Sequence, residues 1–472
     1  MNTDERLDHA LRNADRLPDP ATRRGPDETR HIARRRTMTR RSLFGLAGLV
    51  AAGGVADALW PRGTSGDHGS QPGAVSGVHV NDRSGPAVQL VSNARPLPAD
   101  SHAIGPISTA EQLFTLDLLR AMPADTSNLV LSPSSLAIAL AMLQLGARGR
   151  TAAEIATVLH TSDLSAQQQA VGWAALTALQ TAGAGSVLES ANSVWQQRGL
   201  RLQRQYMAGL KQYFDAGVWQ VDFARNMNGA LSALNQWVAL HTHNKITKLF
   251  NPGDLDPSTV LVLANAEYFN ADWQYKFDRS ATRPAPFHRA DGSSVTVPFM
   301  HYSGKVAMVT NSRFLAAQLP YAGFRFAAQV IMPTQGSLPD LLKTLTQTDL
   351  ASIANTEPAG QGDVIMPRFT AQTYTKLVPA LQQLGMHTAF TDAADFSAMC
   401  STTALKVETV VQRDYLKVDE DGTEAAAVTG VGMQPTAARV PVPFDHPFLF
   451  LVRDTLTGAV LFAGQIQDPS AS

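Results

Sequence analysis

The chain has 472 residues, of which 44% are hydrophobic and 17% are charged, and its formal net charge is −1. This composition is typical of soluble globular proteins and excludes an intrinsically disordered chain or a membrane protein with many spans. Cys400 is the single cysteine, so no intramolecular disulfide can form.

The N-terminal region differs from the rest of the chain, because its first 60 residues hold 11 arginines and 8 acidic residues. The remainder is mildly acidic, which argues against a nucleic-acid partner. Arg40 and Arg41 precede a weakly apolar Gly/Ala-rich stretch, 42–59, and 56–58 (Ala-Asp-Ala) is a small-x-small cleavage site. This arrangement predicts that 1–58 is a basic region with a twin-arginine export signal. An uncleaved membrane anchor through 42–59 and a cytoplasmic tail are the alternatives.

Residues 59–106 are rich in Gly, Ser, Pro and Asp and show no hydrophobic periodicity. They therefore predict a flexible linker. The folded domain is expected over 107–472. Ser108 and Glu111 have the spacing of a capping box, which predicts that the first helix begins at Ser108.

Hydrophobic patterns then alternate between helical and strand-like periods. Ser132 as N-cap, Pro133 at the first helical position and Gly146 as a stop predict one helix clearly. The predicted helices after the first cover 133–146, 151–160, 166–183, 230–246 and 377–386. The predicted strands cover 186–197, 260–273, 294–300, 305–310, 314–321, 325–333, 362–370, 410–418, 447–454 and 459–466. This order predicts an α+β fold without a second domain.

Motifs for catalysis are missing from the sequence. It contains no G-x-S-x-G, no H-E-x-x-H, no C-x-x-C and no Gly-rich phosphate loop. His241 and His243 have no third ligand nearby in the sequence, so we interpret them as surface or cap residues rather than a metal site. We expect no catalytic residues, no cofactor and no metal, with a hydrolase on an unfamiliar fold left as an alternative.

Short motifs in a fixed order carry the strongest signal. They are Asn128 with SPSS (132–135), GARGRT (146–151), VDF (221–223), LNQWV (234–238), NKI (244–246), LVLANAEYFNADW (261–273), Thr282 with Phe287, LPY (319–321), MPRF (366–369), LGM (384–386), ADFS (394–397), DEDGTEAAAVT (419–429), HPFLF (446–450) and LFAGQI (461–466). With these motifs the chain resembles a serpin over about 108–469, as an exported, bacterial-type member. The resemblance implies three β-sheets, about eight or nine helices and an exposed reactive-centre loop at about 420–441.

The resemblance also implies how this loop acts. In inhibitory serpins a target serine protease cleaves the loop, and the arm before the cut enters the largest sheet as a new strand. The hinge of that arm would comprise Glu420, Gly422, Thr423, Glu424, Ala425, Ala426, Ala427 and Thr429. Since strand residues alternate between faces, Thr423, Ala425, Ala427 and Thr429 would face inward, where their small size lets the strand enter. Gly422 would let the backbone bend where insertion starts.

The family spacing places the reactive bond at Thr436–Ala437, whether counted forward from Gly422 or back from Phe448. A small β-branched residue before the bond favours proteases of elastase or subtilisin type. Cleavage after Arg439, which would suit trypsin-like proteases, is the alternative.

A sheet-opening gate is implied by the family resemblance. Its members in this chain are Ser132, Ser135, Asn265 and Gln412, the last standing where the family usually has histidine. Trp273 matches the residue at the top of the insertion site. Glu267 replaces a usually apolar residue and needs a partner if buried, so Gln412 and Glu267 leave open whether sheet opening is altered.

The expected partner is a serine protease, held in a covalent acyl complex by a monomeric inhibitor. Segment 161–185, which corresponds to the basic helix of polysaccharide-activated serpins, has no Lys or Arg, so no heparin site is expected. The alternative function is a non-inhibitory serpin that acts as a binding or chaperone-like protein.

Overall fold

The structure is a computed structural model of the chain. It describes residues 79–80, 87–92, 94–97, 103–123, 127–180, 186–358, 361–423 and 442–471. The chain divides into the units Met1–Gly77 and Val78–Ser472, and the sheets and helices below belong to the second unit.

The described strands form three sheets, as predicted. In spatial order, the central sheet contains β1 (His79–Val80), β2 (Ala87–Val91), β5 (Gly217–Val221), β4 (Ser186–Gln197), β6 (Leu261–Asp272), β15 (Gly422–Thr423), β14 (Val411–Val418) and β13 (Phe369–Lys376). The second sheet contains β3 (Leu129–Leu131), β18 (Val460–Ile466), β17 (Phe448–Asp454), β11 (Phe326–Pro333), β10 (Phe314–Pro320) and β9 (Ala307–Thr310). The third contains β16 (Val442–Pro443), β12 (Gln361–Pro367), β8 (Ser294–Lys305) and β7 (Arg283–His288).

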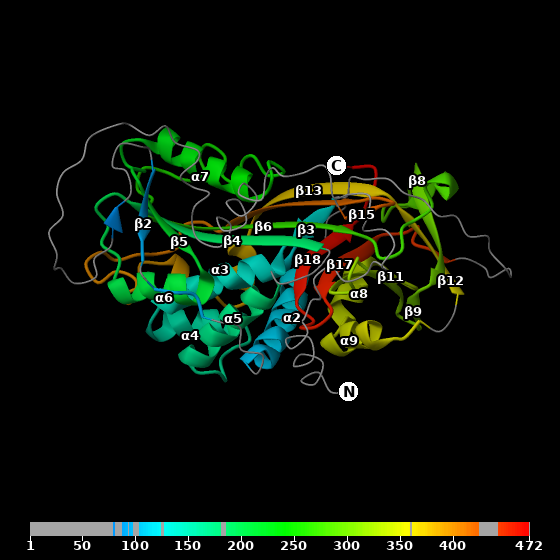
Figure 1. The fold of residues 1–472 in the computed structure, drawn as a ribbon, viewed down its shortest axis with the longest axis horizontal. Helices are drawn as coiled ribbons and strands as arrows, with labels where there is room; N and C mark the ends of the chain where they lie inside the picture. The colour runs from blue at the N-terminus through cyan, green and yellow to red at the C-terminus, as the bar shows by residue number, and fades with distance from the viewer. Residues whose placement is uncertain are drawn as a thin grey trace, which may run out of the picture. The chain divides into compact units, whose positions relative to one another are not determined.

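Nine α-helices lie within the described residues, in agreement with the expected eight or nine. They are α2 (Ile104–Ala121), α3 (Pro133–Gly146), α4 (Gly149–Val158), α5 (Ala166–Gln180), α6 (Arg204–Phe214), α7 (Met227–His241), α8 (Leu338–Thr344), α9 (Gln347–Asn355) and α10 (Val378–Gln383). Figure 1 shows α7 on one face of β4 and β6 and the group from α3 to α6 on the other. In the part of the chain that the structure describes, every helix is too short or too polar to span a bilayer.

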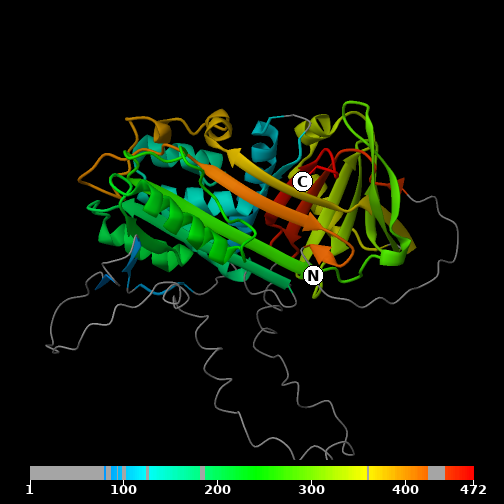
Figure 2. The same cartoon turned by 90° about the horizontal axis from the view of Figure 1, so that it is seen from above.

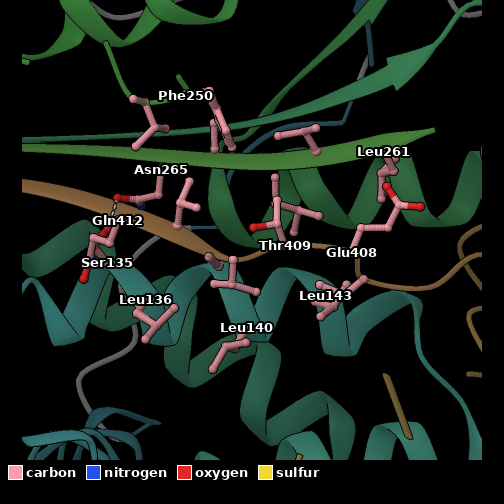
Figure 3. Close-up of a pocket in the computed structure, with 18 of the residues that line it drawn as sticks. Ser135, Leu136, Leu140, Leu143, Phe250, Leu261, Asn265, Glu408, Thr409 and Gln412 are labelled. Atoms are coloured by element: carbon pink, nitrogen blue, oxygen red, sulfur yellow. Dashed lines mark hydrogen bonds between the residues drawn. The ribbon is translucent and has the colours of Figure 1, made fainter. Parts of the chain in front are cut away.

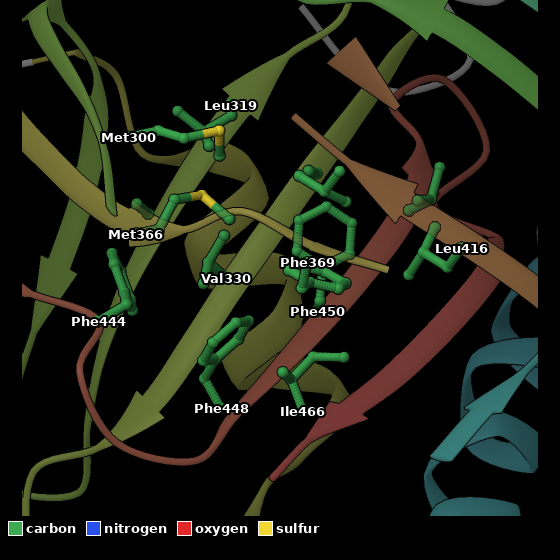
Figure 4. Packing of buried hydrophobic residues seen from close by; sticks show 14 of the residues in the cluster. Met300, Leu319, Val330, Met366, Phe369, Leu416, Phe444, Phe448, Phe450 and Ile466 are labelled. Atoms are coloured by element: carbon green, nitrogen blue, oxygen red, sulfur yellow. The ribbon is translucent and has the colours of Figure 1, made fainter. Parts of the chain in front are cut away.

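The second sheet is buried on both faces, because β17 and β18 are buried at every position. On one face Phe448, Phe450 and Ile466 pack with Phe369 of β13 and Leu416 of β14 (Figure 4). The other face packs against α2, α8 and α9. Each fully buried Phe or Ile contributes about 1.5–3 kcal/mol to the free energy of folding relative to an exposed one. The contacts between the second sheet and the central sheet are therefore strongly stabilising.

The central sheet differs from the second because one of its faces is more accessible. In β14 the buried and half-buried positions alternate, with Gln412, Asp414, Leu416 and Val418 on the buried side. Figure 2 shows β6, β14 and β13 as long strands of the central sheet, and the short strand β15 lies between β6 and β14.

The structure corrects two expectations about the N-terminal part of the domain. Within the linker expected over 59–106, β1 and β2 extend the central sheet, because β2 pairs with β5 in antiparallel register and Val88 is only 4% exposed. Helix α2 begins at Ile104 rather than Ser108, whose hydroxyl donates to the carbonyl of Thr457 instead of capping. The composition of 59–106 cannot show that β2 pairs with β5, a strand about 130 residues later in the chain.

Candidate functional site

The central sheet contains a gap beside its shortest inner strand. Strand β15 separates β6 from β14 but has only two residues, which pair Thr423 with Ala271 on one side and with Val418 on the other. Beyond β15 the two long strands flank a pocket, which we call the slot. Residues from β6, β14 and α3 line it (Figure 3), among them Leu136, Leu140, Leu143, Leu261, Asn265 and Gln412.

Helix α3 forms the floor of the slot. Its sequence, PSSLAIALAMLQLG, has no ionisable side chain, and Leu136 and Leu140 are among the residues that line the slot. The helix begins under the sheet because Ser132 caps it by accepting from the backbone N–H of Ser135 at 3.3 Å, and Pro133 occupies the first turn. The slot therefore has an apolar floor and a polar end at the N-terminus of α3.

The four predicted gate residues meet at this polar end. Gln412 Nε2 of β14 donates to the carbonyl of Ser132 at 2.8 Å, and its Oε1 accepts from the Ser132 backbone N–H at 3.4 Å. On the other side the Ser135 hydroxyl donates to Asn265 of β6, and Asn265 Nδ2 donates to Asn192 Oδ1 at 2.6 Å. The helix terminus thus connects β6 to β14 by hydrogen bonds, and glutamine supplies both a donor and an acceptor.

Glu267 of β6 is buried at the same place, 7% exposed, and accepts from the hydroxyl of Ser132. Ser132 is the partner that the sequence could not identify. Burial raises the pKa of Glu267 to about 7, against the lowering effect of the Ser132 hydrogen bond.

Asp414 of β14 is a further buried carboxyl that the sequence reasoning missed. It is 5% exposed, and burial, with a smaller effect of the Glu267 charge, raises its pKa well above the usual range. A signal existed, because the period of two in VQRDYLKV puts Asp414 on the same face as Leu416 and Val418. Two carboxyls of raised pKa therefore lie along the slot.

The described part of the hinge lies inside the sheet. Thr423 is 2% exposed, and its hydroxyl is hydrogen bonded to that of Tyr321. A Cβ on Gly422 would lie 2.1 Å from the carbonyl oxygen of Ala271, so only glycine fits between β6 and β14 there. Gly422 is needed for this close approach, and it is not among the residues with positive φ.

Polar contacts hold the chain just before β15. Glu420 accepts from the Thr282 hydroxyl at 2.8 Å and lies 3.5 Å from the Arg368 guanidinium. Asp421 forms an ion pair with Arg279. These contacts fix the point from which the loop departs.

Trp273 lies at the same end of the central sheet. Its ring stacks on Tyr321 with centroids 4.5 Å apart, and its Nε1 donates to the carbonyl of Asp419 at 2.9 Å. Its backbone N–H donates to the carbonyl of Asp421 at 2.8 Å. Trp273 therefore contacts both Tyr321 and the backbone of 419–421, at the start of the predicted hinge.

Several predicted residues lie outside the described residues. They are the hinge residues Glu424, Ala425, Ala426, Ala427 and Thr429, the reactive-bond residues Thr436 and Ala437, and the competing Arg439. The segments 1–58 and 42–59 lie outside them as well. Among the described residues, no group of three or more His, Cys, Asp and Glu could hold a metal ion.

Comparisons with known proteins agree with this geometry. Residues 109–469 match the family model described as serpin (serine protease inhibitor). An uncharacterized serpin-like protein of Thermococcus kodakarensis is 34% identical over 77% of this chain and 86% of its own length. The crystal structure of the thermophilic serpin tengpin in its native state matches with a TM-score of 0.70 and 27% identity, over 79% of this chain and 97% of that one.

A second solved structure, thyroxine-binding globulin in complex with thyroxine, matches with a TM-score of 0.70 and 25% identity, over 77% of this chain and 99% of that one. The relatives include archaeal and eukaryotic proteins, so the matches do not single out a bacterial type.

Proposed function

The chain belongs to the serpin family of serine protease inhibitors, and we propose that it is an irreversible suicide inhibitor of serine proteases. The observation that carries the proposal is the slot, a strand-wide gap with β15 already inserted at one end. The segment that begins in β15, TEAAAVTG (423–430), has no bulky, proline or basic residue that would obstruct further insertion.

The mechanism is a competition between two rates. The serine of the target attacks the Thr436 carbonyl and forms an acyl-enzyme, releasing the amine of Ala437. The freed arm then extends β15 through the slot over about 14 residues, roughly 45 Å, and carries the attached protease with it. Inhibition results if insertion is faster than hydrolysis of the acyl-enzyme, and otherwise the chain is only a substrate.

The target class follows from the residue before the bond. Threonine fits the shallow apolar pockets of elastase-like and subtilisin-like proteases, whereas trypsin-like pockets require a cation. The variant Thr436→Arg should shift inhibition toward trypsin-like proteases. An unchanged preference would place the reactive bond elsewhere, with Arg439 as the first alternative.

The direct test is to incubate the protein with an elastase-like or subtilisin-like protease and to run a denaturing gel. A covalent band that survives heating, at the summed mass of the protease and the serpin, is expected. Complete cleavage with full protease activity would contradict inhibition and favour the second candidate, a non-inhibitory serpin that acts as a binding or chaperone-like protein. The structural match to thyroxine-binding globulin in complex with thyroxine supports that candidate.

The proposal includes an extracellular or cell-surface location, reached through the twin-arginine signal in 1–58. It also includes a monomeric state. The presence of Arg40 and Arg41 before a weakly apolar stretch supports export. Mass spectrometry of the secreted protein should find a mature N-terminus near residue 59, whereas a full-length, membrane-bound protein would favour the anchor through 42–59.

A further inference from the structure

Glu267 and Asp414 lie on opposite sides of the slot, and neither is used by the mechanism above. Glu267 belongs to β6 and Asp414 to β14, and both line the slot. Glu267 Oε1 and Asp414 Oδ2 are buried and have no hydrogen-bond partner among the described residues. Such a pair is costly in a closed sheet, so its presence requires a reason.

The register of β15 shows what an inserting strand would bring to this pair. Thr423 lies opposite Ala271 of β6 and Val418 of β14, and both pairings are antiparallel. Because both pairings are antiparallel, residue 427, four positions after Thr423, corresponds to the residues four positions before Ala271 and Val418. These residues are Glu267 and Asp414. A strand that continues in this register therefore places the side chain of residue 427 between the two carboxyls.

Residue 427 is alanine, and its methyl group can neither donate a hydrogen bond nor neutralise a charge. Two positions later Thr429 would lie between the amide side chains of Asn265 and Gln412, where its hydroxyl can bond. The strand would also cover what remains accessible of the two side chains, which are 7% and 5% exposed before insertion. An ionised Glu267 would there keep the Ser132 hydroxyl on one oxygen, but Glu267 Oε1 and Asp414 Oδ2 would stay buried without partners, whereas protonated carboxyls are tolerated.

We propose that Glu267 and Asp414 form a carboxyl pair that selects a small neutral side chain at position 427 of the entering strand and couples insertion to proton uptake. Each carboxylate that is ionised before insertion takes one proton from solvent as the strand enters. The inference rests on the proposed function, because it concerns the same slot.

The surroundings of the pair allow few other charges to compensate. The Glu267 charge raises the pKa of Glu111 of α2, and the Arg453 guanidinium of β17 acts on Glu111 rather than on the pair. The neighbouring elements α3, β3 and β18 carry no ionisable side chain, and Arg413 points to the other face of β14, over Tyr374. Lys406 and Glu408 also line the slot, but the Lys406 ammonium is paired with Asp392 at 2.7 Å. No described cation is therefore placed to hold both carboxyls ionised.

The direction of the pH dependence follows from these positions. Before insertion the pKa of Glu267 is about 7, and insertion raises it further by removing water. Below pH 7 the carboxyl already carries its proton and insertion needs none. Above pH 7 each proton taken up slows insertion by up to about tenfold per pH unit.

The experiment uses a labelled synthetic peptide with the sequence of residues 424–436, EAAAVTGVGMQPT, which begins where β15 ends and is expected to anneal into the slot of the intact protein. Its annealing rate is followed by fluorescence anisotropy from pH 6 to pH 9. With the wild type the rate should fall above pH 7, and with the double variant Glu267→Gln/Asp414→Asn it should be independent of pH. Circular dichroism and the melting temperature establish that the double variant is folded.

Changing the peptide gives a reciprocal test. The substitution Ala427→Lys should reverse the profile, so that annealing is faster above pH 7, because an ammonium pairs with the ionised carboxylates. The matched control Ala426→Lys puts the same charge on the outward face and should keep the wild-type profile.

The two hypotheses fail in different ways. Annealing with the same pH profile in the wild type and the double variant overturns the carboxyl pair and leaves the proposed function intact. If no peptide anneals, the fraction of serpin that forms the covalent complex with the protease is measured for the wild type and for the double variant in the same buffers. The ratio of the two fractions at each pH is then independent of how pH affects the protease. A constant ratio from pH 6 to pH 9 overturns the pair, and no complex at any pH overturns the proposed function.

Discussion

At the scale of single residues, Thr423 is a buried position where a charged side chain should be costly. Its side chain is buried in the central sheet against Tyr321. Thr423→Arg should expel the two residues of β15 but leave the rest of the fold and cleavage of the loop intact, and it should abolish the covalent complex, because a buried charged side chain costs on the order of several kcal/mol. Denaturing gels with the target protease measure this conversion from inhibitor to substrate.

The control for Thr423→Arg is Glu424→Arg, which introduces the same side chain at the next position, expected to face outward in an inserted strand. It should retain most of the inhibition. If Thr423→Arg inhibits as well as the wild type, the inward assignment of Thr423 during insertion is wrong.

Glu111 illustrates how burial makes stability depend on pH. Its carboxylate accepts from the backbone N–H of Val460 at 3.0 Å, and burial raises its pKa to about 8 despite this bond, the Thr115 hydroxyl and the Arg453 charge. A carboxyl whose pKa is higher in the folded than in the unfolded chain loses stability as pH rises from the unfolded pKa, near 4.5, to the folded one. The loss is at most about 1.4 kcal/mol per pH unit.

The variant Glu111→Gln keeps the acceptor for Val460 but cannot ionise. Its melting temperature should exceed that of the wild type by an amount that grows from pH 5 to pH 8. A constant difference over that range would contradict the raised pKa.

At the scale of elements, we expect the link between α3 and β14 to control how readily the sheet opens. The Gln412 side chain satisfies both backbone groups of Ser132. Gln412→Ala removes both bonds, while the Ser132 carbonyl still accepts from the backbone N–H of Leu136 at 3.1 Å, so the loss is about 0.5–1.5 kcal/mol per bond. The closed gate is then less stable, and loop–sheet polymers should form several times faster on mild heating, as measured on native gels.

The matched control is Gln144→Ala, at the other end of α3, where the side chain makes a long hydrogen bond of 3.5 Å to Ala152. It should polymerise at the wild-type rate. Equal rates for both variants would remove Gln412 from the gate.

Elements with a local signature were predicted well from the sequence. Strand β4 has the predicted bounds, 186–197, and α3 begins after Ser132 and ends at Gly146 as predicted. The run 362–370 was predicted as one strand, but the chain changes sheets at Arg368, so that β12 and β13 belong to different sheets. A continuous extended run cannot show a change of partner. Helix α6 and strand β2 were missed.

The slot was harder to predict than its flanking strands. Family motifs pointed to the predicted gate residues Ser132 and Asn265, which lie in SPSS and in 261–273, and Gln412 was assigned as the position where the family usually has histidine. The facing of Glu267 and Asp414 depends on strands almost 150 residues apart in the sequence and on the register of β15 between them. Such long-range register is set by tertiary pairing and has no local signature.

At the scale of the whole molecule, the central sheet is unfinished while the second sheet is fully packed. Strand β15 has only two residues, whereas its neighbours β6 and β14 have 12 and 8. Most of the length of β6 and β14 therefore lies beyond the end of β15. Unpaired strand edges inside a sheet favour the addition of a further strand. The loop that follows β15 is connected at its far end to β16 in the third sheet, so it cannot enter fully while it is uncut.

Cleavage within the loop should therefore raise the stability of the protein. Once the bond is cut, the arm can extend β15, pair with both neighbours and cover the apolar floor provided by α3. About 5 kcal/mol of added stability corresponds to a rise in the melting temperature on the order of 10 °C. Differential scanning calorimetry of the intact protein and of protein cut in the loop by a non-target protease measures the difference. The cut Thr423→Arg variant, whose arm should not enter, serves as the control and should show little increase. A cut wild-type protein that melts no higher than the intact one would show that the slot does not receive the loop.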